Sequence, residues 1–312
     1  MRSAFRAAGV KFNFSVTRHR IIVKTLQAED AASALSKVFG VVSVSPALTL
    51  PADSSSWGPL AAEFAKSSMK PNFSFAVRAH RLHKKGPNTP QIERTVGSAI
   101  QVATGARVNL TAPDVVFYLE VYSDAAYLFT EKRGGVGGLP YGTQGKVACL
   151  LSDSDDVLAA WALMRRGCVV CFVHPGSWES AEQLLGLILP WFPSKPQVYV
   201  FSGEIPAEAG VDWLSGEQFK AGLLSGLARR RKISAVAAGY GLRHLTYLPV
   251  IRGGIQSPVL TPLLGADEET LRRWSAYLGF SGGQCKSAPL TPQHGVKEPF
   301  DAAHLADLLT LA

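Results

Sequence analysis

The chain has 312 residues, of which 47% are hydrophobic and 18% charged, and its formal net charge is +8. With average apolar content and 29 Gly and 19 Pro spread along it, the chain is expected to be globular rather than disordered or collagen-like. Four cysteines in so long a chain are not a disulfide framework, so we expect a reducing, cytoplasmic environment. No signal core is predicted, because residues 1–10 contain no apolar run. No membrane span is predicted either, because prolines interrupt the most apolar stretch, at 184–192.

The first 133 residues have the pattern of two small α+β units, in line with a length that favours two or three domains. A Ser/Pro-rich stretch at 51–58 separates the units and is expected to be a linker. We expect strands at 21–23, 41–44, 73–80, 115–122 and 125–130, and helices at 28–39, 60–68 and 90–104. Apolar residues alternate along 115–122, so one face of that strand should be more exposed than the other.

A glycine cluster at 134–138 indicates a hinge, after which the pattern becomes α/β. Strands are expected at 147–151, 168–173 and 197–201, alternating with helices at 157–164, 179–189 and 219–238. Such alternation predicts a parallel sheet with right-handed crossovers. Ligands of parallel sheets lie beyond the carboxyl ends of the strands, which directs attention to the loop after Leu151.

Two stretches look like motifs of known chemistry, but neither is expected to act as one. The stretch 134–146 is no Walker A loop, because Pro140 and Val147 stand where that motif has Gly and Ser or Thr, and the stretch precedes its strand. Cys168 and Cys171 form C-x-x-C, typical of a metal or redox site. Residues three apart on a strand face opposite sides, so we interpret them as two buried apolar residues.

Basic residues gather in two places. One strand and its loop carry Arg78, His80, Arg81, His83, Lys84 and Lys85, which indicates either a polyanion site or a solvated face. The run 229–232 is expected to point around its helix in several directions, which favours simple solvation.

Three segments are informative: FAVRAHRLHKKGPNTPQIERTVGSAI from Phe75, PDVVFYLEVYSDAAYLFTEK from Pro113 and GGLPYGTQGKV from Gly137. They resemble the THUMP domain and linker of the tRNA 4-thiouridine synthetase family, and the resemblance extends over nearly the whole chain. KVFGVVSVSPA at 37–47 resembles the family's ferredoxin-like N-terminal domain, and RRGCVVCFVHP, SPVLTPLLGADEETL and PQHGVKEP continue the resemblance downstream. It implies a truncated ferredoxin-like domain at 1–55, a THUMP domain at 56–133, a Gly-rich linker at 134–146 and a doubly wound, parallel-sheet PP-loop ATPase-like domain at 147–312.

The resemblance also implies a function. The N-terminal and THUMP domains of this family bind the acceptor region of tRNA, and the PP-loop domain adenylates uridine 8 before sulfur transfer. THUMP domains read folded RNA by shape and backbone charge. The implied RNA-binding residues are Arg78, Arg81, Lys84, Lys85, Arg94, Lys132 and Arg133.

The PP-loop motif of the family, S-G-G-x-D-S, is altered in this chain. It falls on 152–157, where Ser152 and Asp156 match but both glycines and the last serine do not. Side chains at the glycine positions obstruct the approach of backbone N–H groups to phosphates. Asp153 adds a charge that repels a triphosphate, although Mg²⁺ held by the loop's aspartates would partly reverse this. Alternatively, the acids simply favour a helix N-terminus.

Other family positions differ as well. The C-x-x-C of archaeal-type members falls on Gly222 and Ser225, and only Cys285 matches its third cysteine, so no iron–sulfur cluster is expected. Cys285 is either a lone persulfide-accepting nucleophile or a surface cysteine. The family's nucleotide-side segment falls on 238–244 and is largely lost. Asp267 survives from a separate G-x-D-x-E-E-like stretch, or else simply caps its helix. The family's first strand and basic turn, before residue 20, are missing or replaced.

Two main hypotheses follow. The first is a tRNA-binding relative of 4-thiouridine synthetase with a degenerate ATP site and weak or no catalysis. The second is an active ATP-dependent tRNA sulfurtransferase making 4-thiouridine at position 8, served by a sulfur-donor protein. In that case ATP and Mg²⁺ would bind at Ser152, Ser154, Asp156 and Asp267, with Cys285 and Asp156 as catalytic residues. A hydrolase or ligase acting on another nucleotide is a third hypothesis. No membrane partner and no separate metal site are predicted, and a homodimer is left open.

Overall fold

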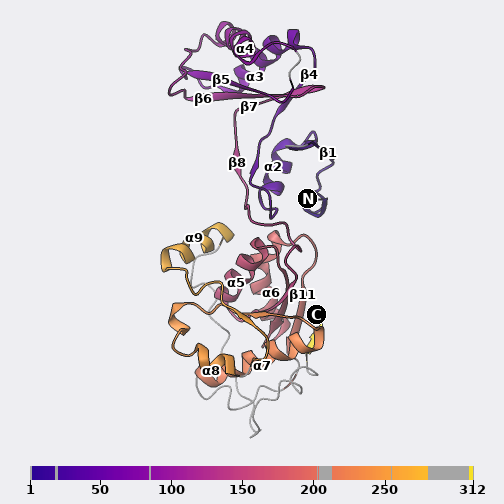
Figure 1. The fold of residues 1–312 in the computed structure, drawn as a ribbon, viewed down its shortest axis with the longest axis vertical. Helices are drawn as coiled ribbons and strands as arrows, with labels where there is room; N and C mark the ends of the chain where they lie inside the picture. The colour runs from indigo at the N-terminus through magenta and orange to yellow at the C-terminus, as the bar shows by residue number, and fades with distance from the viewer. Residues whose placement is uncertain are drawn as a thin grey trace. The chain divides into compact units, whose positions relative to one another are not determined.

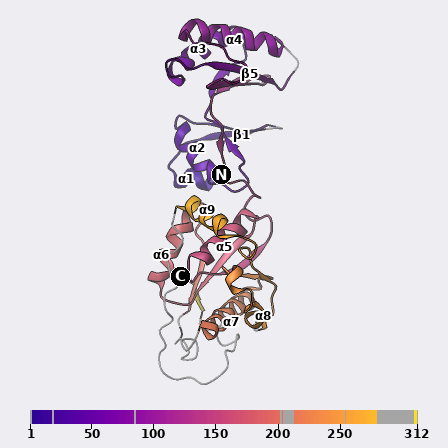
Figure 2. The same cartoon turned by 90° about the vertical axis from the view of Figure 1, so that its left-hand side faces the viewer.

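The computed structural model describes residues 2–17, 20–83, 86–201, 203, 213–253, 255–279 and 309–311 (Figures 1 and 2). The described chain forms two compact units. One holds residues 5–36 and 43–134, and the other holds 2–4, 37–42 and the residues from 135 onward. A short helix, α1 (Arg2–Ala7), opens the chain. None of the helices in the described ranges is long and apolar enough to cross a membrane.

The first unit contains a four-stranded sheet in the order β4-β7-β6-β5, in which β5 and β6 are parallel and the other neighbours antiparallel. Two further pairs, β1-β2 and β3-β8, are antiparallel. The elements are β1 (Asn13–Val16), β2 (Ile21–Lys24), α2 (Ala28–Ser36), β3 (Ser43–Val44), β4 (Leu48–Pro51), a 3-10 turn (Ser54–Ser56), α3 (Trp57–Ser68), β5 (Phe75–Arg81), α4 (Thr89–Thr104), β6 (Val115–Val121), β7 (Ala125–Phe129) and β8 (Arg133–Gly134).

Local sequence explains why α4 lies where it does. Asn88 and Gln91 form a reciprocal capping box at its start, and Gly105 ends it with a left-handed φ of 67°. Ile92, Val96 and Ile100 follow at four-residue spacing and are buried. They pack with α3 against one face of the sheet (Figure 1), where Phe117, Leu119 and Val121 are the buried, alternating residues of β6. The predicted two-faced character of this strand is confirmed.

The second unit is an α/β domain with a six-stranded sheet in the order β13-β12-β9-β10-β11-β14. Every pairing is parallel except that of the edge strand β14, which is antiparallel to β11. The elements are β9 (Lys146–Leu150), α5 (Ser154–Arg165), β10 (Val169–His174), α6 (Trp178–Ile188), a 3-10 turn (Leu189–Trp191), β11 (Gln197–Phe201), α7 (Trp213–Arg231), β12 (Val236–Ala237), a 3-10 turn (Leu242–His244), α8 (Leu248–Gly253), β13 (Val259–Leu260), α9 (Glu268–Leu278) and β14 (Leu309–Leu311).

Helices cover both faces of this sheet, as a doubly wound fold requires. Val147 and Cys149 of β9 pack with α5 and α6, whereas Ala148 and Leu150 pack with α7. Cys168 and Cys171 likewise belong to opposite cores. The predicted α/β class is confirmed, and these two thiols cannot share one metal ion.

Two expected elements differ from the structure. The helix expected at 219–238 ends at Arg231, because Lys232 has a left-handed φ of 53°, and residues 236–237 form β12 instead. A strand, β1, precedes residue 20, where the family's first strand was expected to be missing or replaced. Its pairing with β2 is a tertiary contact that composition alone does not reveal.

The glycine stretch packs closely within the α/β unit. A Cβ on Gly138, which has φ 76°, would lie 2.1 Å from the carbonyl oxygen of Arg165 at the end of α5. Leu139 N–H donates to the same oxygen at 2.9 Å. These glycines therefore allow a close backbone approach rather than cradle a phosphate.

Candidate functional site

The loop between β9 and α5 lies at the carboxyl edge of the parallel sheet and carries the two residues that match the PP-loop motif. Asp156 is 3% exposed, and its Oδ2 accepts the N–H of Ser152 at 2.8 Å and its hydroxyl at 2.7 Å. The structure thus brings Ser152 and Asp156 into direct contact.

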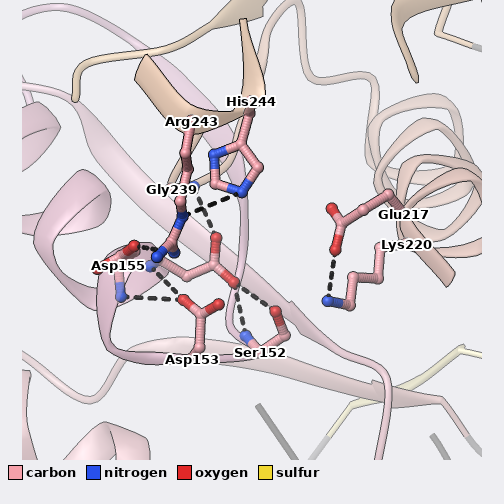
Figure 3. Close-up of polar contacts among 9 residues, drawn as sticks. Ser152, Asp153, Asp155, Glu217, Lys220, Gly239, Arg243 and His244 are labelled. Carbon is pink, nitrogen blue, oxygen red and sulfur yellow. Dashed lines mark hydrogen bonds and ion pairs between the residues drawn. The ribbon is translucent and has the colours of Figure 1, made fainter. Parts of the chain in front are cut away.

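Asp153 occupies the N-terminus of α5. Its Oδ1 accepts the N–H of Asp155 at 2.9 Å and that of Asp156 at 3.0 Å. Orphan N–H groups at a helix start are the donors that bind phosphate in such folds. With the N–H of Ser152 included, three backbone donors of this loop are already bonded to the loop's own carboxylates (Figure 3).

The segment after β12 closes over the loop from the other side. Gly239 N–H donates to Asp156 Oδ1 at 2.7 Å, and a Cβ on Gly239 would lie 2.4 Å from the carbonyl carbon of Asp155. Arg243 pairs with Asp155 through its guanidinium, and His244 lies beside it. The segment 239–244 thus packs directly against the start of α5.

Burial changes the acidity of the site. Desolvation, together with the nearby Asp153 carboxylate, raises the pKa of Asp156 to about 7, although the Gly239 N–H, Ser152 and Lys220 favour the ionised form. Burial and Asp153 also raise the pKa of Asp155, against the effect of Arg243. The site is thus crowded with carboxylates, which disfavours a further anion.

Three buried residues around this loop were not identified as site residues from the sequence. Glu217 and Lys220 of α7 form a buried ion pair of 2.8 Å, and Lys220 influences Asp156 electrostatically (Figure 3). The signal for this pair was present, because two opposite charges stand three residues apart just before the apolar middle of the helix. His174, at the end of β10, is buried and donates to the carbonyl of Leu151 at 2.5 Å, and burial lowers its pKa.

The other three predicted nucleotide-site residues differ in position: one belongs to the loop, one lies at the start of α9 and one falls outside the described residues. Ser154 is the buried first residue of α5. Asp267 caps α9 by accepting the N–H of Thr270 at 2.8 Å. Cys285 lies outside the described residues. Within the described ranges, no three His, Cys, Asp or Glu side chains gather as metal ligands.

The basic strand-loop segment is divided between two faces. Arg78 is exposed on the face of the sheet opposite α3 and α4, and its register partner on β6 is Tyr118. Arg81 lies on the helix side and lines, with His83 and Trp57, a hollow of about 190 Å³. Lys84 and Lys85 lie outside the described residues.

The other predicted RNA-binding residues have different environments. Arg94 is exposed on α4. The ammonium of Lys132 lies 3.9 Å from the ring centroid of Tyr118, on the same face as Arg78. Arg133 is paired with both Glu131 and Glu29, so its charge is already largely balanced within the protein.

Comparison with known proteins adds independent information. A THUMP domain model matches residues 59–131. A probable tRNA sulfurtransferase of Methanocaldococcus jannaschii is 31% identical over 89% of this chain and 81% of its own length. A tRNA sulfurtransferase of Pyrobaculum aerophilum is 34% identical over 79% of this chain and 54% of its own length.

Two solved structures share the fold. The crystal structure of PH1313 from Pyrococcus horikoshii has a TM-score of 0.74 at 27% identity, covering 89% of this chain and 90% of its own. A 4-thiouridine synthetase in complex with RNA and bound ATP has a TM-score of 0.77 at 20% identity, covering 94% of this chain and 84% of its own. At 20% identity this second likeness concerns the fold alone.

Proposed function

Because the chain belongs to the tRNA sulfurtransferase family, we propose that it is a tRNA-binding protein whose nucleotide site is closed by its own side chains, with weak or no thiolation activity. The observation that carries the proposal is the position of the Asp153 carboxylate. It bonds the two N–H groups at the start of α5 where a phosphate of ATP would need them. The family motif has glycine at this position.

Two further features support the closed state. Gly239 and Arg243 hold the carboxylates of Asp156 and Asp155, so opening the site would break a buried hydrogen bond and an ion pair. Removing one partner of a buried polar contact costs about 1–3 kcal/mol. The residues of the loop therefore do not fit a triphosphate in this arrangement, and we assign them no catalytic step.

RNA binding rests on the THUMP domain and on its exposed cations. Arg78 and Lys132 share one face of the sheet with the ring of Tyr118, and Arg94 lies on α4. Guanidinium and ammonium groups that contact RNA phosphates release counterions, and this release contributes to affinity. We expect a cytoplasmic tRNA with an accessible acceptor end to be the partner.

An active ATP-dependent tRNA sulfurtransferase is the second candidate. Ser152 and Asp156 keep the motif positions and contact one another. The relatives named tRNA sulfurtransferase also favour this candidate. Under this candidate the loop opens when ATP·Mg²⁺ arrives, and Cys285 receives sulfur.

Calorimetric titration with ATP·Mg²⁺ separates the two candidates. We expect no saturable binding at sub-millimolar concentration by the wild-type protein. Sub-millimolar binding that Asp156→Ala abolishes, accompanied by formation of 4-thiouridine in tRNA, would establish the active enzyme instead.

RNA binding is tested separately by fluorescence anisotropy with labelled tRNA over a series of salt concentrations. We expect the affinity to fall steeply with salt, and the salt slope of Arg78→Gln and of Arg94→Gln to be shallower by about one each. Lys66→Gln is the matched control, because Lys66 is an exposed cation of α3 already paired with Glu63. Salt-independent binding, or none, would contradict the proposal.

A further inference from the structure

A second basic site lies on the α/β domain, at the amino ends of its strands. Lys146, Arg230, Arg231 and Lys232 line a hollow of about 190 Å³ together with Cys171, Gln197 and Ile233. Its lining thus includes four cations and no acid. The run 229–232 was expected to be simply solvated, yet three of its members line this hollow together with Lys146 from another element.

The hollow is separate from the loop at 152–157. Lys146 is the first residue of β9 and Leu150 the last, so the two sites lie at opposite edges of the sheet. At about 3.3 Å per residue, the length of the strand places them roughly 15 Å apart. The closed nucleotide site therefore leaves this hollow unaffected.

The backbone of Lys232 indicates that its side chain is needed there. Lys232 follows α7 with φ 53°, and the N–H of Ile233 donates to the carbonyl of Ala228 at 2.8 Å. This is the Schellman ending, in which the left-handed position is usually glycine. A lysine there costs roughly 1 kcal/mol relative to glycine. Strain of this kind is a pointer to function when the side chain reaches a site.

Neighbouring contacts orient the other donors. The guanidinium of Arg231 lies over the ring of Tyr199, 5.4 Å from its centroid. The thiol of Cys171 donates to Gln197 Oε1 at 3.3 Å, which leaves the amide N–H groups of Gln197 for a ligand in the hollow. The guanidinium of Arg231, the two ammonium groups and an amide together match the oxygens of a phosphate.

A simpler explanation of these basic residues is that they stabilise the end of α7, because cations favour a helix C-terminus. It accounts for Arg230 and Arg231 in the last turn of α7. It does not account for Lys146, which belongs to a strand, or for the strained lysine where glycine would end the helix equally well.

We propose that this hollow binds a backbone phosphate of RNA, so that the α/β domain contacts the tRNA in addition to the THUMP domain. The proposal rests on the proposed function. Lys146, Arg231 and Lys232 form no ion pair with any other residue of the described chain, and all three are exposed. Exposed charges hold a single small anion weakly in salt, whereas a polynucleotide adds such contacts through counterion release.

The test uses the full-length protein, labelled tRNA and the variant Lys232→Gly. This change removes a charge and relieves the backbone, so we expect an unchanged or higher thermal midpoint together with a threefold to tenfold loss of tRNA affinity near 0.1 M salt, on the order of one phosphate contact. Arg231→Gln should lower tRNA affinity by a similar factor and make the salt slope shallower by about one. Arg273→Gln removes an exposed charge from α9 and is the control expected to leave affinity unchanged.

The outcomes separate this inference from the proposed function. If Arg78→Gln weakens tRNA binding while Lys232→Gly and Arg231→Gln bind like the wild type, the hollow does not contact RNA and only this inference fails. If wild-type protein does not bind tRNA, the proposed function fails as well. If inorganic phosphate raises the thermal midpoint of the wild type but not of Lys232→Gly, and both bind tRNA equally, the hollow takes a free anion and the assignment to RNA is wrong.

Discussion

Replacing Asp153 with glycine should reopen the start of α5 to phosphate. The substitution removes the carboxylate that accepts the N–H groups of Asp155 and Asp156 and restores the residue that the family motif has there. The loss of a cap to glycine costs only a few tenths of a kcal/mol, so the protein should stay folded. The gain for a nucleotide is larger, because a carboxylate about 4 Å from a phosphate charge repels it by about 4 kcal/mol at an effective dielectric of 20.

That repulsion corresponds to nearly a thousandfold in affinity, which we take as an upper bound because salt screens part of it. We therefore expect Asp153→Gly to gain at least tenfold in affinity for ATP·Mg²⁺, measured by calorimetric titration and by a rise in thermal midpoint with nucleotide. Asn88→Gly removes the cap of α4 and is the control for cap loss alone. Equal and weak binding of ATP by Asp153→Gly and wild type would refute the role given to Asp153, as would tight binding by the wild type.

Three further outcomes follow from the site. Gly239→Ala should lower the free energy of unfolding by more than about 2 kcal/mol, because its Cβ would lie 2.4 Å from a backbone atom of Asp155, and a stability within error of wild type in urea unfolding would contradict this packing. The raised pKa of Asp156 means that the folded protein holds a proton that the unfolded chain releases, so the unfolding free energy should fall by up to about 4 kcal/mol as pH rises from about 4 to about 7. Urea unfolding across this range should show a smaller decrease for Asp156→Asn than for wild type, and parallel curves would exclude Asp156 as the source. Asp267→Ala should cost about 1 kcal/mol of stability, because α9 loses the cap that accepts the N–H of Thr270, and nucleotide titrations should stay unchanged. An altered nucleotide titration would show that Asp267 contributes to the nucleotide site.

Much of the fold could be predicted because its signals are local. Continuous apolar runs such as Val147–Leu151 and Cys168–Val173 are what a buried parallel strand requires, and the capped, four-residue spacing of α4 fixes a helix. The sequence predicted the end of α7 too late, because helix propensity continues through 232–238. The left-handed residue that ends the helix is Lys232 rather than a glycine, so the sequence gives no stop signal there.

The candidate site was predictable only in part. Ser152 and Asp156 are four residues apart, so the motif identified both and the loop between them. The residues that close the loop are distant in sequence, since Gly239 and Asp156 are separated by 83 positions. Arg133 was predicted from the sequence to bind RNA. The structure shows that its guanidinium is already paired with two glutamates of the protein.

The sequence by itself determined the α/β class, the THUMP resemblance and the altered nucleotide motif, because each depends on residues that are neighbours along the chain. Only the tertiary structure decided that Asp153 turns its carboxylate onto the N–H groups of α5. It alone brought Lys146 to the end of α7, since a strand and a helix some eighty residues apart meet only when the sheet has formed. The net charge of +8 says that a polyanion is a suitable partner, and the fold decides where that charge converges.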